Sequence, residues 1–226
     1  MKSGWLDGIR AVSFDVGGTL IEPWPSVGHV YAAAAAQGGF GSLDPLDLNL
    51  RFYAAWKRHS AWFDFTKDSW HKLVCEALAG LGPQATSPEL FEAIWIAFMQ
   101  AEAWRLFEDV RPCLTGLRAR GLRFCVVSNW DERLVPTLRN LGLEQEFECI
   151  IASAVLGIAK PSPGIFAAAQ RALGLPADQI LHVGDTQRED REGALAAGFR
   201  GIWLDRSGRE NGADIRRLTD LTDLLA

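Results

Sequence analysis

The sequence is poor in sulfur-containing residues, with four cysteines and two methionines in 226 residues. Cys75, Cys113, Cys125 and Cys149 are scattered and form no CxxC pair, which argues against a zinc site or a disulfide framework. Cys125 and Cys149 fall inside apolar runs. We therefore expect reduced thiols in a protein core, which is typical of the cytoplasm.

Long apolar segments and a positive charge surplus are also missing. No stretch approaches the roughly 20 apolar residues of a membrane span, and the first residues, MKSGWLDGIRAVSFD, contain no apolar signal core. The formal net charge is -5, so nothing draws the whole chain to nucleic acid or anionic lipid. We expect a cytoplasmic protein that binds no membrane and no nucleic acid. Its oligomeric state leaves no mark in one sequence.

Hydrophobic residues make up 48% of the chain, and many lie in short runs that alternate with helical patterns. The runs expected to form buried strands are 9–14, 122–127, 147–152, 180–183 and 201–204. Helices are expected at 132–141, 164–173 and 188–197, each followed by a glycine that suits a left-handed helix end, Gly142, Gly174 and Gly198. This alternation predicts an α/β fold, a doubly wound, Rossmann-like parallel sheet.

Residues 22–107 interrupt this alternation. The segment shows no clear strand, and helices are expected at 46–62, 69–79 and 88–107. It holds six of the nine tryptophans, which we interpret as core residues. We expect a helical domain at 22–107, inserted into a core domain made of 1–21 and 108–226.

Asp15 follows the first expected strand, and Gly17, Gly18 and Thr19 come directly after it. The carboxyl ends of parallel strands form the binding crevice of such sheets. A carboxylate beside exposed backbone N–H groups can act as a nucleophile next to an oxyanion site. Alternatively, Asp15 is a strand-ending residue that caps a turn.

Ser128, Asn129 and Lys160 also follow expected strands. The Ser128 hydroxyl and the N–H after it can hold a phosphoryl oxygen, although a helix N-cap explains them too. Lys160 precedes Pro161, which keeps it out of the following helix. Its side chain can therefore reach a carboxylate cluster or extend into solvent.

Asp185 ends the fourth strand, and Asp190 lies five residues further on. Together with Asp15 they would concentrate negative charge at one edge of the sheet, which requires a compensating cation. Mg2+ suits a few carboxylates together with water and phosphate. Alternatively, Asp190 is an acid favoured at a helix N-terminus.

Taken in order, these four strand ends resemble the motifs of the haloacid dehalogenase (HAD) superfamily, in its capped subfamily I. The segments SNWDERL, KPSPGIF and HVGDTQREDREGALAAG resemble in particular the branch of dehalogenase-like hydrolase-domain proteins. The resemblance covers nearly the whole chain. It implies that residues 22–107 form a helical cap that closes over the crevice.

The resemblance also implies roles for single residues. Asp15 would form an aspartyl-phosphate, with Lys160 as the second catalytic residue, on a small phosphorylated substrate. The implied substrate-binding residues are Gly18, Thr19, Ser128, Asn129 and Lys160. The implied Mg2+ ligands are Asp15, the carbonyl of Gly17, Asp185 and Asp190, with Asp190 supporting from just outside.

One departure from the family pattern lies at Gly17, where family phosphatases usually carry a second Asp that serves as general acid and base. Its loss leaves open a weakened enzyme, a binding or regulatory protein, or a proton supplied by His59 or His71. Dehalogenation is a further alternative, but the retained Asp185 and Asp190 argue for metal and against it. Phosphonate hydrolysis would need a cap lysine, and the candidates are Lys57, Lys67 and Lys72.

Overall fold

The computed structural model describes residues 7–82 and 84–225, so residues 1–6 of the expected core domain lie outside the described part. The chain divides into two compact units with separate hydrophobic cores. Unit 1 consists of Met1–Ile21, Leu106–Glu132 and Gly142–Ala226, and unit 2 of Glu22–Arg105 and Arg133–Leu141. The segment Arg133–Leu141, expected in the core domain, thus groups with the insertion. The role of unit 2 as a cap stays a prediction.

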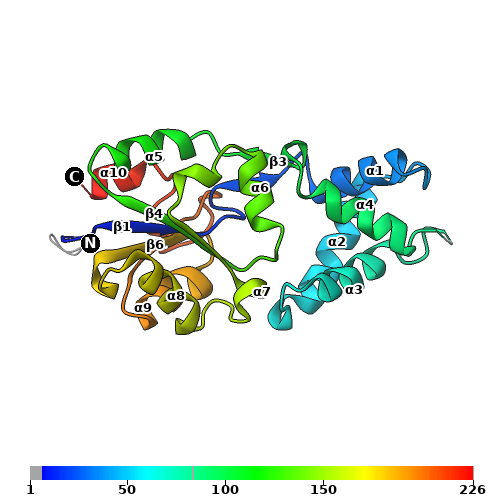
Figure 1. The fold of residues 1–226 in the computed structure, drawn as a ribbon. Coiled ribbons are helices and arrows are strands. Elements are labelled where there is room, and N and C mark those ends of the chain that lie inside the picture. The colour runs from blue at the N-terminus through cyan, green and yellow to red at the C-terminus, as the bar shows by residue number, and fades with distance from the viewer. Residues whose placement is uncertain (1–6, 83, 226) are drawn as a thin grey trace. The chain divides into compact units, whose positions relative to one another are not determined.

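Unit 1 is built on a five-stranded parallel sheet (Figure 1). Its strands are β1 (Ala11–Phe14), β4 (Arg123–Ser128), β5 (Cys149–Ala152), β6 (Ile180–Gly184) and β7 (Arg200–Trp203), in the order β5-β4-β1-β6-β7. Each expected strand run overlaps one of these strands. The predicted doubly wound α/β fold is confirmed.

Helices cover both faces of this sheet. Figure 1 shows α5 (Val110–Arg118) and α10 (Asp220–Leu224) on one face, and α8 (Pro163–Leu173) and α9 (Gly193–Ala196) on the other. The short helix α7 (Ser153–Leu156) follows β5, and single 3-10 turns lie at Glu144–Glu146 and Ala177–Gln179. The expected helix 188–197 is instead a π-helical turn, η5 (Gln187–Glu192), followed by the short α9. The three glycines do adopt positive φ angles, 65° at Gly142, 63° at Gly174 and 84° at Gly198.

The register brings the ends of the central strands together. Phe14 at the end of β1 pairs with Val126 of β4 and with Val183 of β6. Because all three strands run in the same direction, the residues that follow them emerge at one edge of the sheet. This edge carries the candidate site.

Unit 2 is mainly helical. Its helices are α1 (Val27–Gln37), α2 (Pro45–His59), which continues as a 3-10 turn at Ser60–Trp62, α3 (Lys67–Leu78), α4 (Pro88–Ala97) and α6 (Leu134–Asn140). The first four begin at side-chain N-caps, Ser26, Asp44, Thr66 and Ser87, each of which accepts a backbone N–H bond. Among the described residues, no helix is long and apolar enough to cross a membrane.

The expectation of a helix over 88–107 and of no strand in the insertion was wrong. Helix α4 ends at Ala97, and after a 3-10 turn at Ala101–Ala103 the chain forms β3 (Trp104–Leu106), which pairs with β2 (Ile21–Pro23). Arg105 forms an ion pair with Glu22 and stacks on the ring of Trp24 at 3.6 Å. These contacts join residues about 80 positions apart in the sequence, and tertiary pairing of this kind overrides local helix propensity.

The tryptophans of unit 2 only partly meet the expectation of a packed core. Trp95 is buried, and Trp56 and Trp70 pack against the same core. Trp62 is 90% exposed and Trp24 is 42% exposed, so these two are not core residues. The four cysteines are free thiols, as expected.

Candidate functional site

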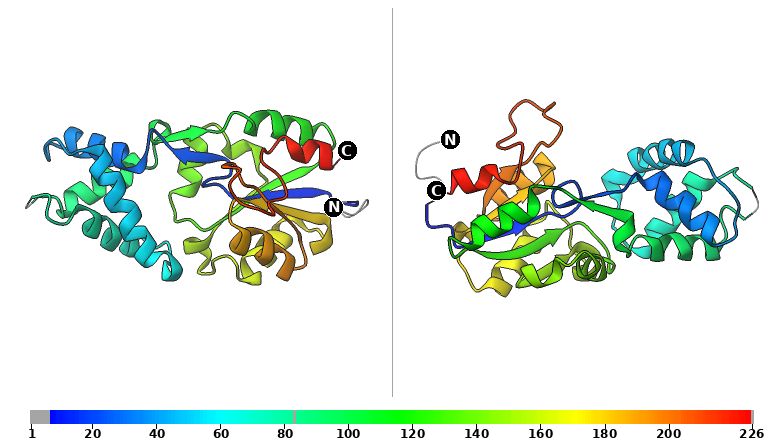
Figure 2. Two further views of the ribbon diagram at one scale, coloured as in Figure 1. Left: turned by 180° about the vertical axis from the view of Figure 1, so that it is seen from behind. Right: turned by 90° about the horizontal axis from the view of Figure 1, so that it is seen from above.

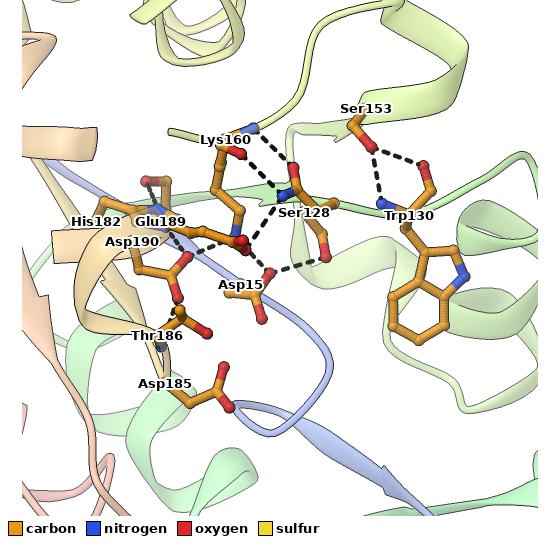
Figure 3. Close-up of polar contacts among 12 residues, drawn as sticks. Asp15, Ser128, Trp130, Ser153, Lys160, His182, Asp185, Thr186, Glu189 and Asp190 are labelled. Carbon is orange, nitrogen blue, oxygen red and sulfur yellow. Dashed lines mark hydrogen bonds and ion pairs between the residues drawn. The ribbon is translucent and has the colours of Figure 1, made fainter. Parts of the chain in front are cut away.

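Asp15 lies directly after β1 and is buried. Its Oδ1 atom accepts hydrogen bonds from the Ser128 hydroxyl at 2.8 Å and from the Lys160 ammonium group at 2.6 Å (Figure 3). Burial raises the pKa of Asp15, although Lys160 opposes this effect. The structure thus brings together three residues that the sequence placed at separate strand ends.

Lys160 joins two carboxylates. Its Nζ atom lies 2.6 Å from Asp15 Oδ1 and 2.5 Å from Asp190 Oδ1, and all three side chains are buried. Burial alone would lower the pKa of Lys160, but the two carboxylates outweigh it and raise the pKa. The side chain therefore stays charged. Of the two alternatives that the sequence left open, contact with the carboxylate cluster is observed and extension into solvent is not.

Asn129 makes three hydrogen bonds to neighbouring residues. Its Oδ1 atom accepts the backbone N–H of Lys160 at 2.7 Å, and its Nδ2 atom donates to the Lys160 carbonyl at 3.1 Å and to Glu189 Oε2 at 3.2 Å. The amide group is engaged within the protein, and its role in binding substrate stays a prediction. This pair of bonds fixes the backbone from which the Lys160 side chain extends.

Asp190, in the η5 turn, has partners on both carboxylate oxygens. Oδ1 accepts from Lys160 and lies 3.0 Å from His182 Nε2, while Oδ2 accepts the backbone N–H of Thr186 at 2.8 Å. Burial would raise the pKa of Asp190, but Lys160 and His182 hold this pKa well below its usual range. Asp190 is therefore ionised, and it orients Lys160.

His182 is a residue of this site that was not predicted from the sequence. Its Nδ1 atom lies 2.7 Å from the Ser13 hydroxyl, and both residues are fully buried. Burial lowers the pKa of His182. A neutral ring that donates from Nε2 to the ionised Asp190 accepts from Ser13 at Nδ1. The available signal was a polar residue inside each of two apolar strand runs, since Ser13 and His182 pair across β1 and β6.

Asp185 completes an acidic cluster. Ligand atoms of Asp15, Asp185 and Asp190 all lie within 4.8 Å of one another. Desolvation at this crowded edge, with the negative charges of Asp15 and Asp190, raises the pKa of Asp185 to about 8, although part of the side chain is open to solvent. The carboxylate lies against Gly18, where an added Cβ would come within 2.2 Å of Asp185 Oδ2.

The donor set fits a divalent cation. Three carboxylates face a single ammonium group, so with all three ionised the cluster carries excess negative charge, which a bound divalent cation would compensate. In the turn after β1, the Val16 carbonyl accepts the N–H groups of Thr19, Leu20 and Ile21, and the Ile21 carbonyl accepts that of Gly18. These bonds leave the Gly17 carbonyl, an expected Mg2+ ligand, outside the bonding of the turn.

The two glycines of this turn differ in what surrounds them. Gly18 has a φ of +73°, which favours glycine, whereas Gly17 does not have a positive φ. A Cβ at Gly17 would only touch the Trp130 ring, at 3.5 Å. Thr19 is fully buried, and its carbonyl accepts a hydrogen bond from Arg206 at 2.7 Å. Roles for Gly18 and Thr19 in binding substrate stay predictions.

Comparisons with known proteins agree with this geometry. The sequence profile of haloacid dehalogenase-like hydrolases matches residues 9–198. The chain is 34% identical to haloacid dehalogenase-like hydrolase domain-containing protein 3 of Danio rerio, over 92% of this chain and 90% of that protein. It is 31% identical to a phosphoglycolate phosphatase of Pseudomonas fluorescens, over 86% of this chain and 69% of that protein.

Among solved structures, the magnesium-bound HAD-hydrolase YfnB of Bacillus subtilis shares the fold. It superimposes with a TM-score of 0.78 at 18% identity, over 96% of this chain and 98% of that one. The match of the profile over most of the chain, together with a relative of this identity and coverage, shows that the chain belongs to the haloacid dehalogenase-like hydrolase family.

Proposed function

We propose that this hydrolase is a Mg2+-dependent phosphatase that acts on a small phosphorylated metabolite. The observation that carries the proposal is the position of Lys160, whose ammonium group contacts both Asp15 and Asp190, two members of the acidic cluster that Asp185 completes. This arrangement offers a nucleophile, a fixed positive charge and a cation site at the carboxyl ends of the sheet strands. Phosphoryl transfer depends mainly on such positioning and charge neutralisation.

In the proposed reaction, a carboxylate oxygen of Asp15 attacks phosphorus, and the bond from phosphorus to the leaving oxygen breaks. Water then hydrolyses the aspartyl-phosphate and restores Asp15. Lys160 and Ser128, which already bond Asp15, hold the phosphoryl oxygens, and Asn129 keeps the Lys160 backbone in place. Bound Mg2+, held by Asp15, Asp185 and the Gly17 carbonyl with Asp190 behind them, would neutralise charge on the phosphoryl group.

The site lacks the side chain that usually transfers protons in phosphatases of this family. Gly17 offers no side chain that could protonate a leaving group. The loss of a general acid or base typically costs a factor of roughly 10² to 10⁴ in rate. We therefore expect slow turnover of unactivated esters and faster turnover of esters with good leaving groups.

The first experiment is hydrolysis of para-nitrophenyl phosphate by the wild type and by Asp15→Asn, each with Mg2+ and with EDTA. Turnover should require Mg2+ and should vanish in Asp15→Asn, because the amide cannot form the covalent intermediate. Turnover that persists in Asp15→Asn would contradict the proposal.

A second candidate, a binding or regulatory protein with catalysis lost, rests on Gly17 alone. It predicts that the wild type binds Mg2+ but leaves para-nitrophenyl phosphate intact, whereas Gly17→Asp gains activity. That result would favour this candidate over the phosphatase.

Carbon–phosphorus cleavage has less support, because a Schiff-base lysine needs a lowered pKa. Lys67 forms an ion pair with Glu92, and Lys72 forms one with Asp68, which raises the pKa of Lys72. Lys57 is exposed on α2. Borohydride trapping of a lysine would nevertheless favour this chemistry, and halide release without Mg2+ would favour dehalogenation.

A further inference from the structure

Two side chains at the end of β7 and in the loop after it donate hydrogen bonds to the backbone of the site. The two acceptor carbonyls lie in the loops that carry Asp15 and Asp185. We call residues 203–218 the brace; Figure 2 shows most of it as the orange-red loop that precedes α10. The brace lies beyond residues 9–198, the part of the chain that the family profile matches. Its residues therefore lie outside the matched segment, although they contact residues within it.

Arg206 is the main contact residue of the brace. Its Nη2 atom donates to the carbonyl of Thr19 at 2.7 Å, in the turn that carries Gly17 and Gly18. Its guanidinium group also bonds both carboxylate oxygens of Asp109, at 3.1 and 3.0 Å, and stacks on the Phe107 ring at 3.9 Å. A planar guanidinium group held by two carboxylate bonds and a ring has little freedom to turn, so the third bond has a fixed direction.

Asp109 connects Arg206 to the far end of the brace. The backbone N–H of Leu218 donates to Asp109 Oδ2 at 2.7 Å, so one carboxylate holds both ends of the loop. Within the loop, the Asp205 carboxylate accepts the N–H groups of Ser207 and Glu210, and the Asp205 N–H donates to the Ile215 carbonyl. The brace is thus a closed, internally bonded loop.

Trp203, at the start of the brace, makes a second contact of the same kind. Its indole Nε1 atom donates to the backbone carbonyl of Asp185 at 3.0 Å. The ring is buried, which fixes its position. Two side chains of the brace therefore hold the backbone of the two loops that carry Asp15 and Asp185.

The turn after β1 has few other bonds to hold Thr19. Its N–H makes a long bond of 3.3 Å to the Val16 carbonyl, and its buried hydroxyl has no partner among the described residues. The bond from Arg206 thus restrains the Thr19 carbonyl directly, in addition to the backbone bonds of Gly18, Leu20 and Ile21 that close the turn. A shift of the Thr19 carbonyl would also move the Gly17 carbonyl two residues earlier, and a movement of about 1 Å in such a site can reduce rate on the order of 100-fold.

We propose that Arg206 is a positioning residue that fixes the nucleophile turn for Mg2+ binding, with Trp203 doing the same for the Asp185 loop. The proposal rests on the proposed function, since it concerns the same cation site. It adds to the cation site two residues that lie outside the segment matched by the family profile. Arg206 acts through the Thr19 carbonyl and touches neither the cation nor the substrate.

The test measures Mg2+ affinity of the whole protein by isothermal titration calorimetry, which does not depend on turnover. Arg206→Ala should weaken Mg2+ binding about tenfold, because a charge-assisted hydrogen bond is worth roughly one such factor. Arg206→Lys keeps the positive charge but loses the planar guanidinium group, so it should also bind Mg2+ more weakly than the wild type. Trp203→Phe should bind Mg2+ about threefold or more weakly. Arg209→Ala is the matched control, since this exposed arginine lies in the same loop.

Two further measurements separate positioning from general damage to the fold. Thermal unfolding identifies variants that are folded at the titration temperature, and Trp203→Phe, which keeps an aromatic ring, serves if Arg206→Ala does not fold. Free guanidinium ion at low millimolar concentration should restore Mg2+ affinity in Arg206→Ala and leave Arg206→Lys unchanged, which a merely structural loss would not show.

Folded Arg206→Ala and Trp203→Phe that bind Mg2+ as tightly as Arg209→Ala would overturn the inference and leave the proposed function standing. A wild type that binds no Mg2+ would instead overturn the proposed function, and this inference with it.

Discussion

Gly17 and Gly18 are neighbours that should respond in opposite ways to an added side chain. At Gly17 a Cβ meets only the Trp130 ring at 3.5 Å, and the backbone needs no positive φ. At Gly18 the φ is +73° and a Cβ would lie 2.2 Å from Asp185 Oδ2. We expect Gly17→Asp to fold and to hydrolyse para-nitrophenyl phosphate faster than the wild type, by less than the roughly 10² to 10⁴ that a general acid or base can contribute, because para-nitrophenolate leaves without a proton.

Gly18→Ala is the paired variant for this prediction. It should lose stability and Mg2+ affinity, because the methyl group displaces Asp185 and strains the turn. Thermal unfolding and calorimetric Mg2+ titration measure both effects. A Gly18→Ala protein that binds Mg2+ like the wild type, or a Gly17→Asp protein that does not fold, would show that the turn differs from the one described.

Mg2+ binding should depend on pH through Asp185. Its pKa in the cation-free protein is raised from 3.8 to about 8, so near neutral pH the group is largely protonated and must lose its proton to bind the cation. The apparent Mg2+ affinity should therefore rise with pH, by up to about tenfold per unit, and level off above about pH 8. Titrations at several pH values measure this, and a flat affinity between about pH 6 and pH 9 would contradict it.

The same shift fixes the sign of the effect on stability. An acid whose pKa is higher in the folded than in the unfolded protein stabilises the fold below its unfolded pKa. That contribution is lost as the pH rises through the folded pKa. The cation-free protein should thus lose stability between about pH 4 and pH 8, and Mg2+ should offset the loss. In Asp185→Asn the loss should be smaller and Mg2+ should no longer offset it, while the raised pKa of Asp15 leaves a weaker trend of the same sign.

Several site residues could be predicted from the sequence because each follows an apolar run. Asp15, Ser128, Lys160 and Asp185 come from different parts of the chain, and a parallel sheet places such ends at one edge. Arg206 gave no comparable signal. It follows the last strand as one charged residue in a polar loop, and its bond to Thr19 joins residues 187 positions apart.

At the scale of elements, strands were easier to predict than helices. The central strands β1, β4 and β6 are buried on both faces, so a short apolar run identifies each of them. Helix α1 escaped prediction, because its alanine-rich sequence shows little amphipathic pattern. Strand β3 depends on its pairing with β2, which local sequence does not reveal.

The packing of α1 against α2 depends on a glycine. A Cβ at Gly28 would lie 2.0 Å from the Pro45 carbonyl oxygen and 2.6 Å from the Asn49 nitrogen, both of which are backbone atoms. Alanine would gain up to about 1 kcal/mol in helix propensity, but overpacking costs about 1 to 3 kcal/mol and backbone cannot move aside easily. We expect Gly28→Ala to lower the free energy of unfolding of unit 2 by about 1 to 2 kcal/mol.

Urea unfolding followed by tryptophan fluorescence measures this effect, and Ala33→Ser on the exposed side of α1 is the control. Mg2+ affinity should not change, since every residue of the proposed cation site lies in unit 1. A Gly28→Ala protein as stable as the control would mean that the two helices can separate without cost.

At the scale of the whole molecule, the two units have separate hydrophobic cores, and most of the tryptophans lie in unit 2. The core of unit 2 gathers residues from α1 to α4, whereas a core cluster of unit 1 lies between β4, β6 and α8. Six of the nine tryptophans lie in Glu22–Arg105, so intrinsic fluorescence reports mainly on unit 2. A protein of this kind need not unfold in a single two-state transition.

Mg2+ should therefore stabilise one unit selectively. A ligand that binds only the native site adds about 2.7 kcal/mol at 100 times its dissociation constant, which raises the melting temperature of unit 1 by several degrees. Calorimetry should resolve two transitions. The transition of unit 2 should coincide with the fluorescence change and keep its melting temperature when Mg2+ is added, whereas the melting temperature of unit 1 should rise. In Asp185→Asn neither should move. If fluorescence and heat absorption instead shift together by the same amount in the wild type, the two cores unfold as one cooperative structure, and binding at the strand edge of unit 1 stabilises the entire chain.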